Sequence, residues 1–277
     1  MSLTHGTTRV PSPRWAIAGV CVLGCSGLLW GSTWVQPGRP ASDPPRTPVL
    51  VELFTSEGCS SCPPADALLM LLDEQQFVAE ALVIPLSEHV EYWNGLGWRD
   101  PFSAPMFTER QQEYAEVLGT GLYTPQMVVD GQTEFVGSQR DIARQAIARA
   151  AVAPKAEIAL AMTRGGSRNV VRVEVTISGV ARLGTRGEAD LWLAVTEDGL
   201  ATDVRRGENA NRRLRHTAVV RRLEKIDTLP IPAPDRFTAA AQLALDPDWQ
   251  DGSLRLVAFL QERESRRVLG VTQIRLE

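Results

Sequence analysis

The sequence predicts an α/β domain with the element order β-α-β-α-β-β-α, followed by an antiparallel β-sandwich. In residues 49–153, short apolar runs typical of buried strands alternate with segments whose apolar residues recur at helical spacing. The dipeptide Asp130-Gly131 is a strong hairpin signal between the last two strands of this half. In residues 154–277, successive apolar runs are separated by turns and not by helical patterns, which is typical of a sandwich.

Patterns along the first half justify its elements in order. Residues 49–54 form a short apolar run, so we expect a buried strand there. Proline is favoured in the first turn of a helix, so Pro63 and Pro64 predict that a helix begins there. The later elements are a strand at 81–86, a loop rich in aromatic residues at 87–102, a helix capped by Ser103 with Pro105 in its first turn, strands at 126–129 and 133–136, and a helix that opens with a capping box of Ser138 and Asp141.

Six strands and one basic segment are expected in the second half. The boundary between the halves is placed near Ala153-Pro154. Residues 204–225 hold eight basic residues and two glutamates, which indicates a solvated hairpin or, alternatively, a docking face for acidic partners or anionic lipids. The strands are predicted at 158–162, 170–177, 191–196, 237–245, 254–261 and 268–276.

The composition and the N-terminal segment restrict the class of protein. The chain has 277 residues, is 44% hydrophobic and carries a formal net charge of −4, so we expect globular domains and no nucleic acid partner. Residues 1–35 are expected to be a signal peptide or membrane anchor, because Arg9 and Arg14 precede an uncharged apolar run at 15–35. Cleavage, lipidation and retention stay open. Residues 36–48 contain five prolines in thirteen positions and predict a linker.

The segment Cys59-Ser60-Ser61-Cys62 lies between the first strand and the first helix. Two thiols at this spacing can join across one turn, and a helix N-terminus stabilises a thiolate. Cys59, which we expect to be the more exposed of the two, would be the nucleophile, and Cys62 would resolve the mixed disulfide. An inert structural disulfide and a metal-handling pair are the alternatives. No other cofactor and no resident metal are expected.

The position of this CxxC, together with Thr124-Pro125 just before a strand, resembles the thioredoxin superfamily. The resemblance implies a thioredoxin-like domain over residues 49–153 and a β-sandwich domain over residues 154–277. It also implies that Pro125 is cis, faces the dithiol, blocks metal and offers backbone to a substrate chain. The segment 51–66 is similar to the hallmark of an exported thioredoxin-like family of unknown function in bacteria and plants, and segments 89–93, 96–102, 123–126 and 207–217 look like its other blocks. That family tends to have Asp where Glu91 stands, and it supplies no established substrate.

Further site residues are expected around the dithiol. The first two strands should be parallel neighbours, so the loop at 87–102 should border the CxxC. His89, with a reference pKa of about 6.5, is expected to store a proton or act as a base for the thiols. The thioredoxin resemblance implies that Glu52 helps to move the proton of the resolving thiol. Trp93, Trp98 and Tyr123 are expected to contact peptide substrates, with packing as the alternative role for this loop.

These features predict an extracytoplasmic thiol–disulfide oxidoreductase that acts on protein thiols or disulfides, in the periplasm or outside the cell. The alternative is a non-enzymatic protein in which the dithiol and His89 handle a soft metal such as Cu(I), or in which the sandwich recruits a partner. The chain has only three histidines, which excludes a His-rich metal site. Membrane attachment through residues 15–35 is a further expectation.

Overall fold

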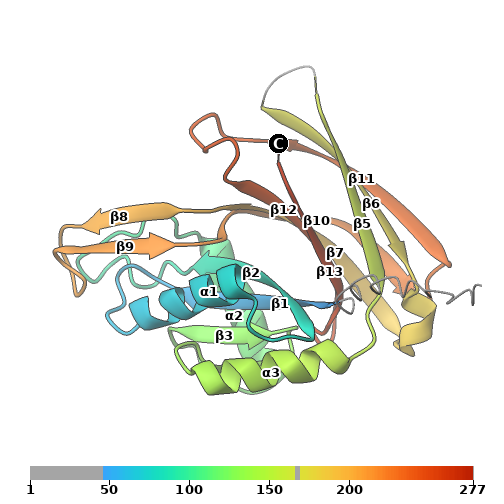
Figure 1. Cartoon of the computed structure of the whole chain (residues 1–277), viewed down its shortest axis with the longest axis horizontal. Helices are drawn as coiled ribbons and strands as arrows, with labels where there is room; N and C mark the ends of the chain where they lie inside the picture. Colours follow the sequence, from blue (N-terminus) through green and yellow to red (C-terminus); the bar gives the residue numbers. More distant parts are fainter. Residues whose placement is uncertain (1–45, 166–168, 277) are drawn as a thin grey trace, which may run out of the picture. The chain divides into compact units, whose positions relative to one another are not determined.

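A mixed eight-stranded sheet runs through the computed structural model, which describes residues 46–165 and 169–276 (Figure 1). Its strand order is β13-β12-β7-β10-β2-β1-β3-β4, and two smaller sheets have the orders β11-β6-β5 and β8-β9. The first half contains β1 (Thr47–Thr55), α1 (Pro63–Gln75), β2 (Ala81–His89), α2 (Pro105–Leu118), β3 (Gln126–Val129), β4 (Thr133–Val136) and α3 (Arg140–Val152). The second half contains β5 (Glu157–Arg164), β6 (Val170–Ser178), the 3-10 helix η1 (Val180–Leu183), β7 (Gly187–Glu197), β8 (Leu200–Val204), β9 (Arg212–His216), β10 (Val219–Ile231), β11 (Arg236–Ala244), β12 (Leu254–Glu262) and β13 (Val268–Arg275).

β1 and β2 are parallel neighbours, as the sequence predicts, because α1 forms a crossover between them. Their last residues, Thr55 and His89, are partners in register. On the other side of β1, Phe54 pairs with Gln126, the first residue of antiparallel β3. The CxxC, the aromatic loop and the Thr124-Pro125 dipeptide therefore all adjoin the same edge of the sheet.

The second half continues the sheet of the first half. Val219 of β10 pairs in parallel with Ser87 of β2, and β7, β12 and β13 then follow in antiparallel pairs. β5, β6 and β11 form a second layer, joined to β7, β12 and β13 by an apolar core. The expected boundary at 153–154 lies between α3 and β5, and one sheet spans it.

Helices cover both faces of the first half of the sheet. α1 and α3 pack against apolar residues of β1, β2 and β3 in one core. On the other face, Phe107 and Tyr114 of α2 join a core with Phe54 of β1 and Phe259 of β12. Because this second core takes side chains from both halves, it fixes the second half against the α/β part.

Two expected helix caps are wrong. The N-cap of α2 is Ala104 and makes no side-chain capping hydrogen bond. Ser103, the expected cap, instead donates from its hydroxyl to the Asp100 carbonyl at 2.9 Å. α3 also begins without a side-chain capping hydrogen bond, so the capping box of Ser138 and Asp141 does not form.

The expected signal or anchor at 1–35 and positions 36–45 of the expected linker lie outside the described residues. Thr47 and Pro48, predicted as the end of that linker, are the first residues of β1. Within the described part of the chain, no helix is long and apolar enough to cross a membrane.

Candidate functional site

Cys59 and Cys62 form a disulfide at the start of α1, with their Cα atoms 5.5 Å apart. Cys62 is the N-cap of α1 and donates from its backbone N–H to the Cys59 carbonyl at 3.2 Å. Both cysteines are fully buried, whereas Ser60 and Ser61 between them are exposed. The expectation that Cys59 is the more exposed cysteine is therefore wrong, because neighbouring segments cover both.

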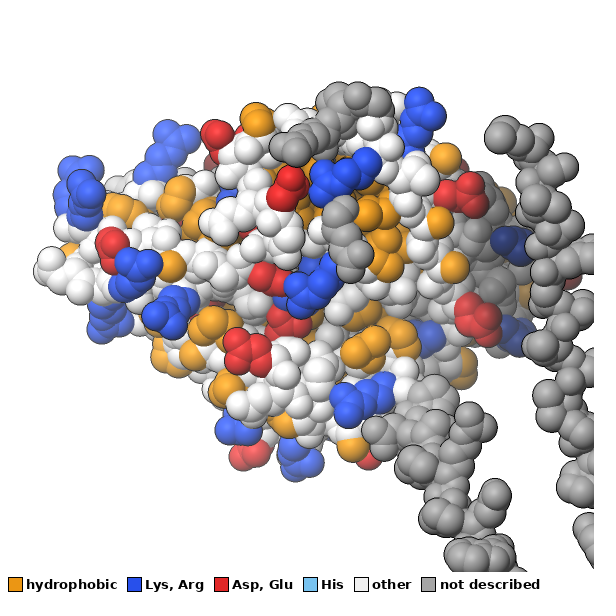
Figure 2. All heavy atoms as spheres, turned by 45° about the horizontal axis from the view of Figure 1, so that its top comes forward, with side chains coloured by type: hydrophobic (Ala, Val, Ile, Leu, Met, Phe, Trp, Pro, Cys, Tyr) orange, Lys and Arg blue, Asp and Glu red, His pale blue; other side chains and the backbone are white. Residues whose placement is uncertain are grey.

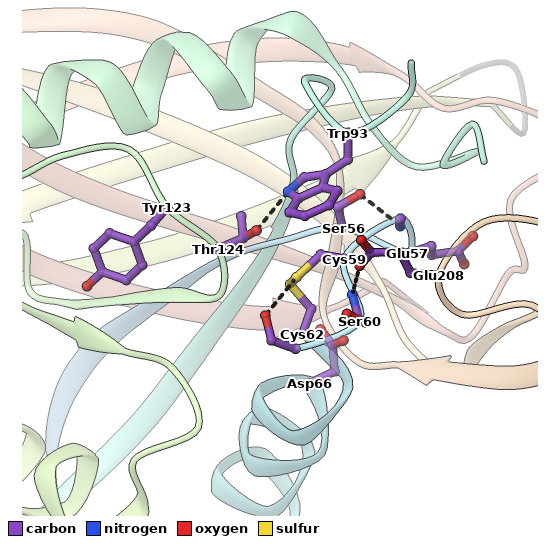
Figure 3. The surroundings of a disulfide bond; sticks show 12 residues. Ser56, Glu57, Cys59, Ser60, Cys62, Asp66, Trp93, Tyr123, Thr124 and Glu208 are labelled. Carbon is purple, nitrogen blue, oxygen red and sulfur yellow. Dashed lines mark hydrogen bonds between the residues drawn. A yellow bond between two sulfur atoms is a disulfide. The ribbon is translucent and has the colours of Figure 1, made fainter. Parts of the chain in front are cut away.

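A loop from the second half of the chain binds the backbone of the CxxC turn. The amide of Asn209, between β8 and β9, donates to the carbonyl oxygens of Glu57 and Cys59, both at 2.9 Å. The carboxylate of Glu208 accepts the Ser60 N–H at 3.0 Å (Figure 3). These three hydrogen bonds join the CxxC turn to the loop between β8 and β9.

The aromatic loop borders the CxxC, as the strand topology predicts. Trp93 donates from its indole N–H to the Thr124 hydroxyl at 2.8 Å, above the disulfide in Figure 3. A Cβ placed on Gly58 would lie 3.0 Å from the Trp93 Cβ, so this close approach favours glycine. The Thr124–Pro125 peptide bond is cis, as the thioredoxin resemblance implies.

The other predicted aromatic residues have different surroundings. Trp98 donates to the Glu57 carboxylate at 2.8 Å and thus supports the residue two positions before Cys59. The Tyr123 hydroxyl donates to Glu134 and its ring points away from the disulfide, so the structure does not bring Tyr123 to the sulfurs (Figure 3). Burial and the Glu134 carboxylate raise the pKa of Tyr123.

Glu52 lies in a different buried cluster. Its carboxylate is 2.6 Å from the Arg110 guanidinium and accepts a hydrogen bond from the Tyr114 hydroxyl at 2.5 Å. Glu88 lies 3.5 Å from the same guanidinium, and burial together with the Glu52 charge raises its pKa well above the ordinary value. The Glu52 carboxylate thus contacts two side chains of α2, Arg110 and Tyr114. This geometry does not support the proton transfer to Cys62 that the thioredoxin resemblance implies for Glu52.

His89 is fully buried in a polar cluster next to the CxxC. Its Nδ1 lies 2.7 Å from the Asp100 carboxylate, and its ring packs edge-on against the ring of His216 at 4.8 Å. Burial alone would lower the pKa of His89, but the Asp100, Asp66 and Glu57 carboxylates outweigh that effect and raise it. Asp100 also accepts the Glu57 N–H at 2.8 Å, so the cluster connects directly to the segment before the CxxC.

Several residues of this site carry no individual signal in the sequence. They are Glu57, Asp66, Asp100, Glu208, Asn209 and His216. Each lies inside one of the sequence blocks 51–66, 96–102 and 207–217. The resemblance therefore indicates the segments that form the site, but not the individual residues. The individual contacts join residues as far as 159 positions apart, which sequence spacing does not predict.

The fold and the site thus define a class of protein: an α/β sheet protein with a CxxC disulfide at a helix N-terminus and a cis-proline at the same sheet edge. The chain belongs to the family described as protein of unknown function (DUF1223), whose model matches residues 50–261.

Two solved structures are similar over most of the chain. Protein AGR_C_4864 from Agrobacterium tumefaciens has 25% identity and a TM-score of 0.62, with 84% of this chain and 96% of that chain covered. HBP35 of Porphyromonas gingivalis has 19% identity and a TM-score of 0.62, with 83% of this chain and 76% of that chain covered. A comparison with curated proteins found no match.

Proposed function

We propose that this chain is a thioredoxin-like thiol–disulfide oxidoreductase that exchanges disulfides with protein substrates outside the cytoplasm. One observation carries the proposal: the Cys59–Cys62 bond sits between the end of a buried strand and a proline-started helix, at the sheet edge that Thr124-Pro125 also adjoins. Positions at a helix N-terminus favour the thiolate, which is the reactive form of cysteine. A disulfide that closes so short a loop restrains little of the unfolded chain, so stabilisation is a weak reason for it.

The proposed exchange conserves atoms and electrons. In the reducing direction, the Cys59 thiolate attacks one sulfur of a substrate disulfide, and the other substrate sulfur leaves as a thiolate. The Cys62 thiolate then attacks the Cys59 sulfur and releases the remaining substrate sulfur. The CxxC loses two electrons and the substrate disulfide gains them. The oxidising direction is the reverse, and the reduction potential of the CxxC decides which one operates.

Substrate access requires movement of the covering segments, because neither sulfur-bearing residue is exposed. Trp93 and the loop around Asn209 lie on the CxxC turn, while Ser60 and Ser61 mark its exposed side. We infer that a substrate polypeptide approaches at Ser60-Ser61 and lies along Thr124-Pro125. Export would place the pair where disulfides persist, and the apolar run at 15–35 supports that location.

Trapping of mixed disulfides tests the proposed function. A Cys62→Ser variant lacks the resolving thiol, so it should accumulate a covalent adduct with a disulfide-containing protein such as insulin through Cys59. The matched Cys59→Ser variant should form far less adduct, because the nucleophile is absent. Absence of adduct from Cys62→Ser, with Cu(I) bound tightly by the reduced wild-type chain, would favour metal handling instead.

A further inference from the structure

A buried carboxyl group lies one helical turn beyond the resolving cysteine. Asp66 follows Cys62 by four residues, and its backbone N–H donates to the Cys62 carbonyl at 3.1 Å. Side chains at this spacing are neighbours on a helix, with Cβ atoms about 5–6 Å apart. Asp66 is only 6% exposed, and Figure 3 shows its carboxyl group directed toward the CxxC turn.

The groups that face Asp66 come from three strands and one loop. His216 of β9 places Nδ1 3.9 Å from the carboxylate, and its Nε2 lies 3.3 Å from Glu57. His89 of β2, the Asp100 carboxylate and the Thr55 hydroxyl of β1 complete the set. Within the described chain, Asp66 Oδ1 and His216 Nδ1 are buried atoms without a hydrogen-bond partner.

The carboxylates of this cluster can outnumber its cations, so the cluster can accept a proton. Glu57, Asp66 and Asp100 can carry three negative charges, whereas His89 and His216 can carry at most two positive charges. Burial penalises a surplus charge, so the cluster favours one additional proton. Burial raises the pKa of Asp66 despite the opposing effect of His216, so its carboxylate takes up a proton more readily than that of an ordinary aspartate.

A small cavity gives water a route to Asp66. A space of about 220 Å³ lies between the start of α1 and β9, and the exposed side chains of Arg213 and Arg215 form part of its wall. A cavity of this size is large enough for several waters, and Asp66, Arg213 and Arg215 supply polar groups in a wall that is otherwise apolar. Its lining residues are Pro63, Asp66, Met70, Arg213, Leu214 and Arg215.

We propose that Asp66, held next to His216, carries the proton that Cys62 loses and regains during disulfide exchange. This inference rests on the proposed function. After Cys59 has formed a mixed disulfide, the Cys62 thiol gives its proton to the Asp66 carboxylate. The resulting thiolate attacks the Cys59 sulfur and the substrate sulfur leaves. The proton then passes from Asp66 to water in the cavity beside β9. In the reverse direction, Asp66 returns a proton to the Cys62 thiolate.

A two-phase reaction with an aromatic disulfide separates the roles of the two thiols. The reduced full chain is mixed with 5,5′-dithiobis(2-nitrobenzoate). Attack by Cys59 releases the first coloured thiolate, and attack by Cys62 on the mixed disulfide releases the second. The first phase tests the proposed function, and the second phase tests proton removal from Cys62.

An Asp66→Asn variant should keep the first phase within about twofold and slow the second at neutral pH by at least about tenfold, since a general base contributes 10²- to 10⁴-fold. The pH profile of the second phase should move toward that of a free thiol near 8.5. Glu74→Gln, which removes an exposed carboxylate of the same helix, should change neither phase. An unchanged second phase and pH profile in Asp66→Asn would overturn the proposal.

His216→Gln gives a second test that leaves the carboxylate in place. Loss of the imidazole removes the main group that lowers the pKa of Asp66. The pH profile of the second phase should therefore shift to higher pH, while the first phase is retained. A second phase with wild-type pH dependence in this variant would contradict the role of the Asp66–His216 pair. If the wild-type chain shows no first phase, so that Cys59 does not attack the aromatic disulfide, that result would instead contradict the proposed function.

Discussion

Asn209 should contribute strongly to stability although it lies 150 positions from the cysteine that it contacts. Its buried amide donates to two carbonyl oxygens, those of Glu57 and Cys59. The Cys59 carbonyl keeps a second donor, the Cys62 N–H, so an Asn209→Ala change leaves mainly the Glu57 carbonyl unsatisfied. An unsatisfied buried group costs about 1–3 kcal/mol and each lost hydrogen bond about 1 kcal/mol, so we expect a loss of about 2–3 kcal/mol.

Urea unfolding of the oxidised chain measures this loss as a lower midpoint with an unchanged slope. Arg206→Ala, at an exposed position of the same loop, is the matched control and should stay within about 0.5 kcal/mol of wild type. Asn209→Asp should destabilise at least as much as Asn209→Ala, because a carboxylate would face two carbonyl oxygens. A stability of Asn209→Ala equal to that of the control would refute the reasoning.

Three further predictions concern charge. Glu208→Gln should lower the pKa of Cys59 in the reduced chain, since it removes a negative charge beside the CxxC turn; an alkylation midpoint at unchanged or higher pH would contradict this. Arg110→Met should cost about 3–5 kcal/mol in urea unfolding, because it leaves Glu52 buried without its cation; a loss below 1 kcal/mol would disprove a structural role. The raised pKa of His89 should add stability that is complete below pH ~6.5 and lost as pH rises through the folded-state pKa, so wild type should lose more thermal stability than His89→Gln between pH 6 and 8.5.

The outline of the first half could be predicted because its signals are local. Apolar runs, prolines at a helix start and the Asp130-Gly131 turn each act over a few residues, and the structure has strands and helices at the corresponding places. The second half has weaker local signals, since β10 carries Arg221, Arg222 and Glu224 and so lacks an apolar run. This segment forms a strand because it pairs with β7 and β2. Local composition does not encode pairing between distant strands.

The site shows the same division between local and long-range information. Cys59, Cys62 and Thr124-Pro125 could be identified from motif and order. Motif and order do not single out Asp66 as the acid one helical turn after Cys62, because Glu52 is also a carboxylate near the CxxC in sequence. Only the packing of α2, which pairs Glu52 with a guanidinium, distinguishes them.

The basic segment is divided between two elements of the structure. Five of its arginines lie on or beside the β8–β9 hairpin, and Figure 2 shows Lys and Arg side chains gathered at the end of the molecule where Figure 1 places that hairpin. The other three basic residues belong to β10. The expectation of a single solvated hairpin over 204–225 is therefore wrong for its last third. The hairpin arginines are Arg205, Arg206, Arg212, Arg213 and Arg215.

A redox titration of the full chain against glutathione tests the central claim most directly. The fractions of free and bonded Cys59 and Cys62 are measured by mass after alkylation at each buffer ratio. The account predicts one two-electron transition, with both thiols appearing together in the folded chain, at a potential above about −300 mV. A disulfide that resists reduction over the whole glutathione range, and yields only when the chain unfolds, would contradict a role in disulfide exchange.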